Sequence, residues 1–315
     1  MSAACSIVIR AFNEAAHIGR LLDGISHQTL KNVQVILVDS GSTDQTVEIA
    51  KSRGVEIVSI SPKEFTFGRS LNAGIAQAES PLIVIASAHV YPVYPDWLER
   101  LLEPLKEPTI ALVYGKQRGA EYSQFSERQI FTHWFGEETQ NPQDHPFCNN
   151  ANSAIRRSLW ELHPYDEKIT GLEDLEWAKW ALENNHKIAY CAEAEIIHVH
   201  DESSSGIHNR YIREGMAFKH IYPHERFSVG DLIQLFLSNT VSDLIEAKRQ
   251  KRFFGEFMNI VRFRWLQFHG TYIGYKRSGP LTWKLKQSFY YPRNSGVDLP
   301  DKNQRDVDPI TYKEN

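Results

Sequence analysis

Four short apolar segments, each followed by a helical pattern, occupy the first 115 residues, and this alternation constrains the fold more than any other feature of the chain. The segments read CSIVIR (5–10), VQVILV (33–38), VEIVSI (55–60) and PLIVIAS (81–87). Strands that alternate with helices in this order predict an α/β fold, with a mostly parallel, nucleotide-binding sheet flanked by helices. Because buried parallel strands are apolar along their whole length, we expect VILV and LIVIA at the centre of the sheet.

The composition is that of a globular protein, with 42% hydrophobic and 23% charged residues. A net charge of −4, without a helix-turn-helix, RNA-binding or zinc-finger pattern, predicts no nucleic-acid partner. Cys5, Cys148 and Cys191 are scattered, and residues 1–20 lack a secretory signal pattern, so we expect a cytoplasmic location. No apolar stretch approaches the roughly 20 residues that span a bilayer, which restricts any membrane association to the inner face.

Polar motifs follow the first two predicted strands. Neither a dinucleotide fingerprint nor a P-loop is present, and the first strand is followed by RAFNEAAHI instead. Asp39 ends the second strand, at the edge of an open α/β sheet where ligands gather, and its carboxylate could accept the imide N–H of uracil or thymine. The alternative is that Asp39 and Asp44 are turn and cap residues.

Several motifs in a fixed order suggest a family. RAFNE (10–14), VDSGSTD (38–44), GRSLNAG (68–74) and GLEDLEWA (171–178) together resemble the family 2 glycosyltransferases of the GT-A fold, and the opening RxFNE looks most like their rhamnosyltransferase-type branch. The resemblance covers residues 5–200. It implies an enzyme that uses a nucleotide-diphosphate sugar donor.

The resemblance also implies a donor site. In that family the first two motifs cradle the nucleoside, which implicates Phe12, Glu14 and Asp39. The third motif lies near the diphosphate, which implicates Arg69 and Asn72, and arginine matches phosphate bidentately. The alternative for Arg69 is a solvated helix start.

Residues 87–89 depart from the family pattern. The family usually carries DxD here, with carboxylates that contact the ribose and a divalent cation, whereas this chain has Ser87-Ala88-His89. Ser87 could bond a ribose hydroxyl and a neutral His89 could ligate Mn²⁺, which tolerates imidazole better than Mg²⁺ does. A single neutral nitrogen predicts weak cation binding before the nucleotide arrives. The alternatives are a metal-free site neutralised by Arg and Lys, or a protonated His89 that contacts phosphate.

The adjacent acids Glu173 and Asp174 open a predicted helix over 173–183. By resemblance Asp174 is the general base that takes the proton of the acceptor hydroxyl, and Glu173 positions the acceptor. The alternative is that both acids complement the helix dipole.

Histidines gather after the last predicted strand, at 196–200. By resemblance a histidine here completes the metal site or touches the diphosphate, so we predict His200 as a second metal ligand and His198 as a diphosphate contact. His208 and Arg210 lie in ESSSGIHNR (202–210), which we expect to be a loop that closes over the donor as a lid, or else an ordinary mobile loop.

The chain divides by pattern into three parts. We expect one glycosyltransferase domain over 1–225, a basic, aromatic helical extension over 226–295 and a flexible tail over 296–315. Within the domain, residues 1–115 form the nucleotide-sugar half and 116–225 the acceptor half.

The helical extension is strongly basic. Residues 246–293 hold eleven Lys or Arg and two acids, interleaved with aromatic side chains. This pattern predicts contact with an anionic membrane surface or a lipid-linked acceptor. The alternative is packing on the protein's own acidic half, with a homodimer as one form of that packing.

We therefore expect an inverting glycosyltransferase that moves a hexosyl or deoxyhexosyl group to a hydroxyl of a glycan or lipid-linked acceptor, in polysaccharide or glycoconjugate synthesis. A degenerate nucleotide-sugar-binding or assembly subunit without turnover is the alternative from another class. A third hypothesis is that the chain is a nucleotidyltransferase.

Overall fold

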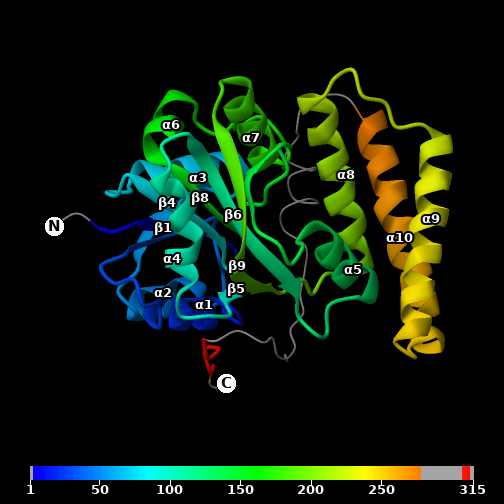
Figure 1. The fold of residues 1–315 in the computed structure, drawn as a ribbon, viewed down its shortest axis with the longest axis horizontal. Coiled ribbons are helices and arrows are strands. Elements are labelled where there is room, and N and C mark those ends of the chain that lie inside the picture. The colour runs from blue at the N-terminus through cyan, green and yellow to red at the C-terminus, as the bar shows by residue number, and fades with distance from the viewer. Residues whose placement is uncertain (1–2, 278–306, 313–315) are drawn as a thin grey trace.

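A mixed β-sheet covered by helices on both faces forms the body of the protein (Figure 1), in a computed structural model that describes residues 3–277 and 307–312. The sheet order is β3-β2-β1-β4-β8-β6-β9-β5, and β7 also pairs with β9. The strands are β1 (Ser6–Ala11), β2 (Gln34–Asp39), β3 (Glu56–Ser59), β4 (Leu82–Ser87), β5 (Val90–Pro92), β6 (Ile110–Gly119), β7 (Gln140–Gln143), β8 (Asn152–Arg156) and β9 (Lys187–His198).

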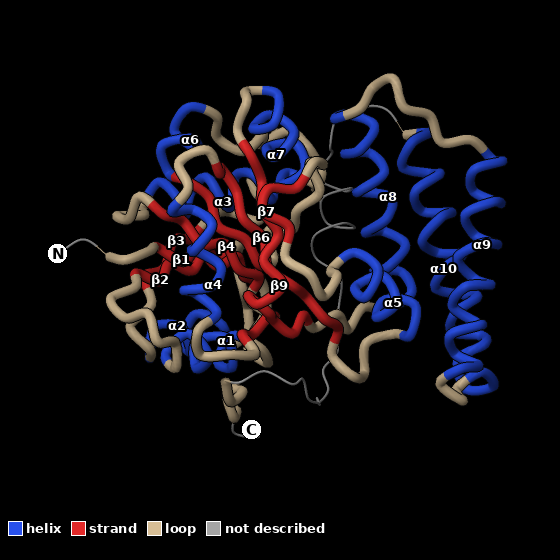
Figure 2. Tube along the Cα trace, viewed as in Figure 1, coloured by secondary structure: helices blue, strands red, loops and turns tan. Residues whose placement is uncertain are grey.

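The predicted parallel order is confirmed for β1 to β4, whose pairs are all parallel. The second half is mixed, because β8 runs antiparallel between β4 and β6. The expected central strands β2 and β4 lie within the sheet, and Figure 2 shows the strands as one layer between helices.

Alternate residues of the central strands feed two separate cores, as the two-residue period of a strand requires. Ile7 and Ile9 of β1 face a core made with residues of α1 (Ile18–Ser26), α2 (Thr46–Ser52) and α4 (Trp97–Leu102). Helix α4 continues directly into a 3-10 helix, Glu103–Lys106. Val8 faces the opposite core. That core includes residues of α3 (Phe67–Ala76), α5 (Phe125–Trp134), α6 (Arg157–Leu162) and α7 (Glu173–Glu183).

Three long helices stand side by side beyond the sheet (Figure 1): α8 (Ser204–Ile221), α9 (Val229–Arg249) and α10 (Phe253–Lys276). Glycines let α8 and α10 approach closely, since a Cβ on Gly274 would lie 2.4 Å from the carbonyl oxygen of Ile212. Between α9 and α10 the buried Arg264 forms a bidentate pair with Asp243, at 2.7 and 2.8 Å. Among the described residues, none of the helices is long and apolar enough to cross a membrane.

One expectation about local structure needs correction. Residues 204–210, predicted as a loop, form the first turns of α8, where the side chain of Ser203 caps the helix by accepting from Gly206 N–H. The flexible tail stays a prediction; within it, Tyr312 donates its hydroxyl to the carbonyl of Pro92 in β5, at 2.6 Å. The rest of the predicted tail, and residues 278–295 of the extension, lie outside the described residues.

Candidate active site

The loops after β1 and β2 are tied to each other by hydrogen bonds. Asn13 N–H donates to the Ser42 hydroxyl at 2.8 Å, and the Asn13 side chain accepts from Thr43 N–H at 2.8 Å. Asn13 has φ +55°, a left-handed conformation that asparagine tolerates better than most residues. The RAFNE and VDSGSTD motifs therefore form one connected structure at the carboxyl edge of the sheet. Phe12 is half-buried just after β1, within that structure.

Asp39 is buried at the end of β2 and organises the turn that follows. Its carboxylate accepts from Gly41 N–H at 3.0 Å and from Ser42 N–H at 3.2 Å. These are the contacts of a turn residue, the structural alternative considered for this position. A role for Asp39 toward a nucleobase stays a prediction.

Glu14 contacts a histidine of the SAH segment. Its carboxylate lies 2.7 Å from Nδ1 of His89, which follows Ser87 at the end of β4. Burial works to lower the pKa of His89, but the charge and hydrogen bond of Glu14 outweigh it, so that the pKa is raised. The sequence predicted both residues at the donor site, but it did not predict that Glu14 and His89 contact each other.

Three histidines come together at the edge of the sheet. Antiparallel pairing of β5 with β9 sets Val90 opposite His198, and Val199 N–H donates to the carbonyl of His89 at 3.0 Å. The rings of His89 and His198 stack with centroids 5.1 Å apart, and those of His198 and His200 lie 4.0 Å apart. One ring nitrogen from each lies within 4.8 Å of the others. These three imidazoles form one group that could hold a metal ion, and Glu127, His200 and Glu202 form another among the described residues.

A buried ionic network supports this cluster. Glu127, in the first turn of α5, lies 2.7 Å from Nδ1 of His200 and 2.6 Å from Nη2 of Arg210. Burial opposes ionisation of Glu127, yet His200 and Arg210 lower its pKa to about 2. Arg210 also pairs with Glu202 at 2.7 Å. Arg210, predicted as a lid or diphosphate contact, is thus held within the protein, and the sequence analysis missed Glu127 and Glu202.

The predicted acid pair stands at the start of α7. Asp174 Oδ2 accepts from Asn150 N–H at 3.0 Å and Oδ1 accepts from Leu175 N–H at 2.8 Å. Glu173 pairs with Arg10 at 3.0 Å. Burial and the neighbouring charge of Glu173 raise the pKa of Asp174 to about 7, against the lowering effect of its backbone donors and of Arg10. An acid with this pKa can exchange a proton near neutral pH.

Arg10 and Asn150 were not predicted as site residues from the sequence, although Arg10 lies in the RAFNE motif. Arg10 is the first residue of RAFNE, and its guanidinium lies 4.6 Å from the centroid of the Phe67 ring. The side chain of Asn150 lies 3.5 Å from a Glu173 carboxylate oxygen. Both residues therefore hold Glu173 beside Asp174.

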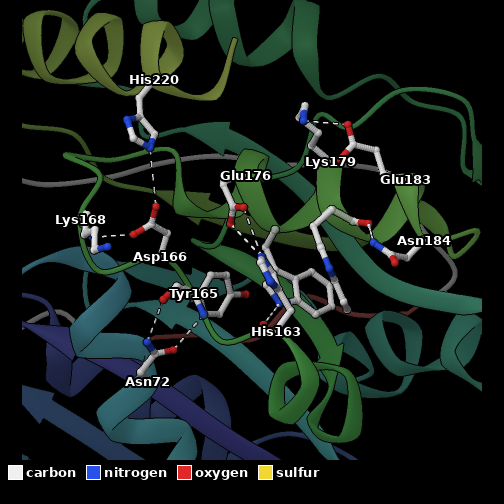
Figure 3. A network of polar contacts seen from close by, with 12 residues as sticks. Asn72, His163, Tyr165, Asp166, Lys168, Glu176, Lys179, Glu183, Asn184 and His220 are labelled. Carbon is white, nitrogen blue, oxygen red and sulfur yellow. Dashed lines mark hydrogen bonds and ion pairs between the residues drawn. The ribbon is translucent and has the colours of Figure 1, made fainter. Parts of the chain in front are cut away.

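Asn72, predicted near the diphosphate, uses its whole hydrogen-bonding capacity inside the protein. Its amide donates to the carbonyl of Tyr165 and to Glu167, and its oxygen accepts from Trp160 and from Tyr165 N–H. Figure 3 shows Asn72 bonded to Tyr165, which belongs to the loop over 163–168. Asn72 therefore positions this loop.

The same loop is held from two further helices. His163 lies 3.2 Å from Glu176 of α7, and Asp166 lies 3.9 Å from His220 of α8 (Figure 3). Arg69 also contacts the loop, through Glu167 at 2.8 Å. The loop leads through Leu172, which has φ +55°, directly into the acid pair.

His208 lies apart from the three-histidine cluster. Its Nε2 is 2.9 Å from Nδ1 of His269, between α8 and α10. Because it faces a helix of the same bundle, the structure gives no support to its prediction as a lid contact.

Comparison with known families gives a match over the first half of the chain. The family model described as "Glycosyl transferase family 2" matches residues 6–162. The O-antigen chain rhamnosyltransferase RfbN of Salmonella typhimurium is 27% identical over 229 residues, which cover 67% of this chain and 71% of RfbN. The O-antigen chain rhamnosyltransferase WbaN of Salmonella anatum is 30% identical over 200 residues, 60% of this chain and 64% of WbaN.

Solved structures share the fold. The mannosyltransferase PcManGT from Pyrobaculum calidifontis, in complex with GDP-Man and Mn²⁺, aligns over 88% of both chains with a TM-score of 0.62 and 16% identity. The S. aureus TarS fragment 1–349, in complex with UDP-GlcNAc, aligns over 99% of both chains with a TM-score of 0.54 and 16% identity. The expected GT-A fold is therefore confirmed.

Proposed function

The chain belongs to glycosyl transferase family 2 and is a glycosyltransferase, and we propose that it transfers rhamnose, with inversion, from a nucleotide-diphosphate donor to a hydroxyl of a growing surface polysaccharide. Rhamnose as the transferred sugar is suggested by the two O-antigen chain rhamnosyltransferases that this chain resembles. An O-antigen type of acceptor agrees with the names of the same relatives.

The observation that carries the proposal is the buried acid pair at the start of α7, where Asp174 accepts two backbone N–H bonds beside Glu173 and burial raises its pKa to about 7. In the proposed reaction Asp174 takes the proton of the acceptor hydroxyl while that oxygen forms a bond to the anomeric carbon. The bond from that carbon to the diphosphate oxygen breaks, and the nucleoside diphosphate leaves with the electron pair. Glu173, held by Arg10, positions the acceptor and keeps the pKa of Asp174 high.

The donor is proposed to lie along the carboxyl edge of the sheet, between the loops after β1 and β2 and the histidine cluster. Phe12 and Asp39 face the nucleoside, Ser87 the ribose, and Arg69 the diphosphate. A divalent cation, Mn²⁺ or Mg²⁺, is proposed at His89 and His200, because one ring nitrogen from each lies within 4.8 Å of the other and of a nitrogen of His198, whose buried Nε2 has no hydrogen-bond partner among the described residues. Such a cation supplies positive charge to the leaving diphosphate.

The test is to incubate the enzyme with nucleotide-activated rhamnose and a panel of other nucleotide sugars, and to determine the anomeric configuration of the product by NMR. We expect transfer from the rhamnose donor with inversion. Retention at the anomeric carbon would contradict the single-displacement mechanism. Nucleotide binding without transfer or donor hydrolysis would favour a non-catalytic subunit, and diphosphate exchange would favour a nucleotidyltransferase.

We also propose that the tip of the α9–α10 hairpin rests on an anionic membrane surface, where a lipid-linked acceptor would be found. Four exposed cations surround the tip, Lys248, Arg249, Lys251 and Arg252. Beside them Phe254 and Met258 are 96% and 72% exposed. Basic charge next to exposed apolar side chains is the combination that binds anionic bilayers.

Flotation with vesicles of anionic and of neutral lipid tests this attachment. We expect recruitment to anionic vesicles that weakens with salt and is lost in a double variant, Phe254→Ser with Met258→Ser. Leu162→Ser is the matched control, since Leu162 is 75% exposed but lies on α6. Absence of recruitment, or dimers in solution that dissociate in the double variant, would overturn the proposal and favour a homodimer at this face.

A further inference from the structure

Helix α9 carries a row of exposed apolar side chains, and Figure 1 shows this helix at the outer edge of the three-helix group. Residues four positions apart lie on the same side of a helix, so side chains at this interval form one continuous row. Each member of the row is at least half exposed. The row consists of Val229 (52%), Ile233 (50%), Leu237 (53%), Val241 (53%) and Ile245 (57%).

The exposed surface around this row is uncharged. The polar residues exposed beside it are Gly230, Gln234, Ser238 and Ser242. Charged groups are depleted in the cores of protein interfaces, whereas an amphipathic helix that lies on a membrane carries Lys or Arg along its polar face. The row on α9 therefore differs from the basic tip of the α9–α10 hairpin, and its surroundings favour a protein partner over a lipid surface.

From this surface we infer that two copies of the chain form a two-fold symmetric dimer, in which the rows on α9 pack against each other in antiparallel orientation. Leu237 is the middle residue of the row. A two-fold axis at this position sets Leu237 against its own copy, Ile233 against Val241 of the second copy, and Val229 against Ile245 of the second copy. Every side chain of the row then has an apolar partner. The inference does not rest on the proposed function.

The shape of the surface suits helix packing of this kind. Rows of residues four apart form ridges, and two such ridges interdigitate when the helix axes cross at about −50°. The neighbouring row on α9 holds Gly230, Ser238 and Ser242, which are small and leave a groove beside the apolar ridge. The ridge of one copy can therefore enter the groove of the other.

The charges at the two ends of α9 favour the antiparallel orientation. The region at its start carries two acids and one base, and the region at its end carries three bases and one acid. An antiparallel pair sets each acidic end beside a basic end of the other copy. A parallel pair would bring the two basic ends together, and their repulsion opposes it. The charged residues are Glu225, Arg226 and Asp231 at the start, and Glu246, Lys248, Arg249 and Lys251 at the end.

Sedimentation velocity of the full-length protein measures its oligomeric state. We expect a dimer that persists at high salt, because its interface is apolar, whereas attraction to anionic vesicles is screened by salt. Leu237→Asp should raise the dissociation constant of the dimer at least about 30-fold, the effect of losing a residue at the centre of an interface. A wild-type protein that stays monomeric, or a dimer that Leu237→Asp leaves unchanged, would overturn the inference.

Two matched controls separate this surface from others. Leu162→Asp introduces the same charge at a residue that is 75% exposed on α6, and it should keep the dimer. The tip variant, Phe254→Ser with Met258→Ser, should also keep the dimer. A monomeric protein that Leu237→Asp releases from vesicles would overturn the inference and assign the row to a lipid surface.

Disulfide cross-linking tests the symmetry of the dimer directly. The native cysteines are all buried, so a cysteine introduced on the surface of α9 reacts without competition from them. Under mild oxidation Leu237→Cys should cross-link to its own copy, and Ile233→Cys should cross-link only when mixed with Val241→Cys. Cross-linking of Ile233→Cys to itself would contradict the antiparallel arrangement. If Leu237→Asp does not fold, Leu237→Cys still decides, since its failure to cross-link would overturn the inference.

Discussion

Glu127 and Asp174 are both buried carboxylates, but their surroundings drive their pKa values in opposite directions. Glu127 faces His200 and Arg210, and its pKa falls to about 2. Asp174 faces two backbone N–H groups and lies next to a second acid, Glu173, and its pKa rises to about 7. Burial penalises both charges, so the difference comes from the neighbouring charges. A carboxylate that is fixed as an anion supports structure, and one that titrates near neutral pH can move a proton.

We expect the largest effect on stability from removing the Glu127 carboxylate, which stays ionised in the folded protein. Glu127→Gln should lower the free energy of unfolding by roughly 3 kcal/mol, the lower end for breaking a buried ion pair, because Arg210 and His200 both lose a buried carboxylate partner. The folded pKa lies below the unfolded one, so this stabilisation is complete above roughly pH 5 and is lost as the pH falls toward 2. Urea unfolding of both proteins at several pH values measures this difference in the free energy of unfolding.

Glu161→Gln is the control for that variant, because Glu161 is 54% exposed in a surface pair with Arg157. Its loss should cost at most about 1 kcal/mol. Equal losses in the two variants would remove the distinction between the buried network and an ordinary surface pair.

Removing the Asp174 carboxylate, which titrates near neutral pH, should lower the rate of sugar transfer. We expect Asp174→Asn to reduce sugar transfer by at least about 10²-fold, the lower range for a general base, with donor affinity nearly unchanged. Glu176→Gln, two positions further on α7 and bonded to His163, is the matched control and should keep turnover within a few fold. Near-normal transfer by Asp174→Asn would exclude Asp174 as the base.

Asn72 is an uncharged polar group that makes all its hydrogen bonds within the protein, so we expect it to contribute to stability and not to donor binding. Asn72→Ala should lower the free energy of unfolding by about 1–2 kcal/mol, because Trp160 Nε1–H and Tyr165 N–H lose their acceptor. Nucleotide affinity, measured by calorimetry, should not change. A loss of nucleotide affinity without a loss of stability would instead support the diphosphate contact predicted from the sequence.

The smallest effect is a shift in a pH profile. Glu173→Gln removes a neighbouring negative charge, so the pKa of Asp174 should fall and the pH of half-maximal turnover should move downward. The readout is the midpoint of the profile, which separates this effect from any loss of acceptor positioning. An unchanged midpoint would mean that Glu173 does not contribute to the raised pKa.

The sequence predicted features that depend on local pattern. The order of β1 to β4 follows from apolar segments that alternate with helices, and α7 begins and ends at the predicted residues, Glu173 and Glu183. The family resemblance was confirmed, and it directed attention to Asp174 before any geometry was available.

Contacts between distant segments were not predictable in this way. Glu127 lies in an unremarkable helix start, FSER, and meets His200 and Arg210 from 73 and 83 residues away. The register of β5 on β9, which sets His89 beside His198, also depends on how the sheet closes. Likewise, the serine-rich segment 202–210 has the composition of a loop, but its residues 204–210 are helical, capped by Ser203 in a helix that packs on α10.

The most direct test of the account is a pH titration of the Asp174 carboxyl group itself. The signal is followed by carbon-13 NMR in protein labelled at aspartate, and is assigned by its disappearance in Asp174→Asn. We predict a midpoint near 7 that moves downward in Glu173→Gln. A midpoint near the ordinary aspartate value of roughly 4 would contradict the claim that Asp174 is poised to take the acceptor proton.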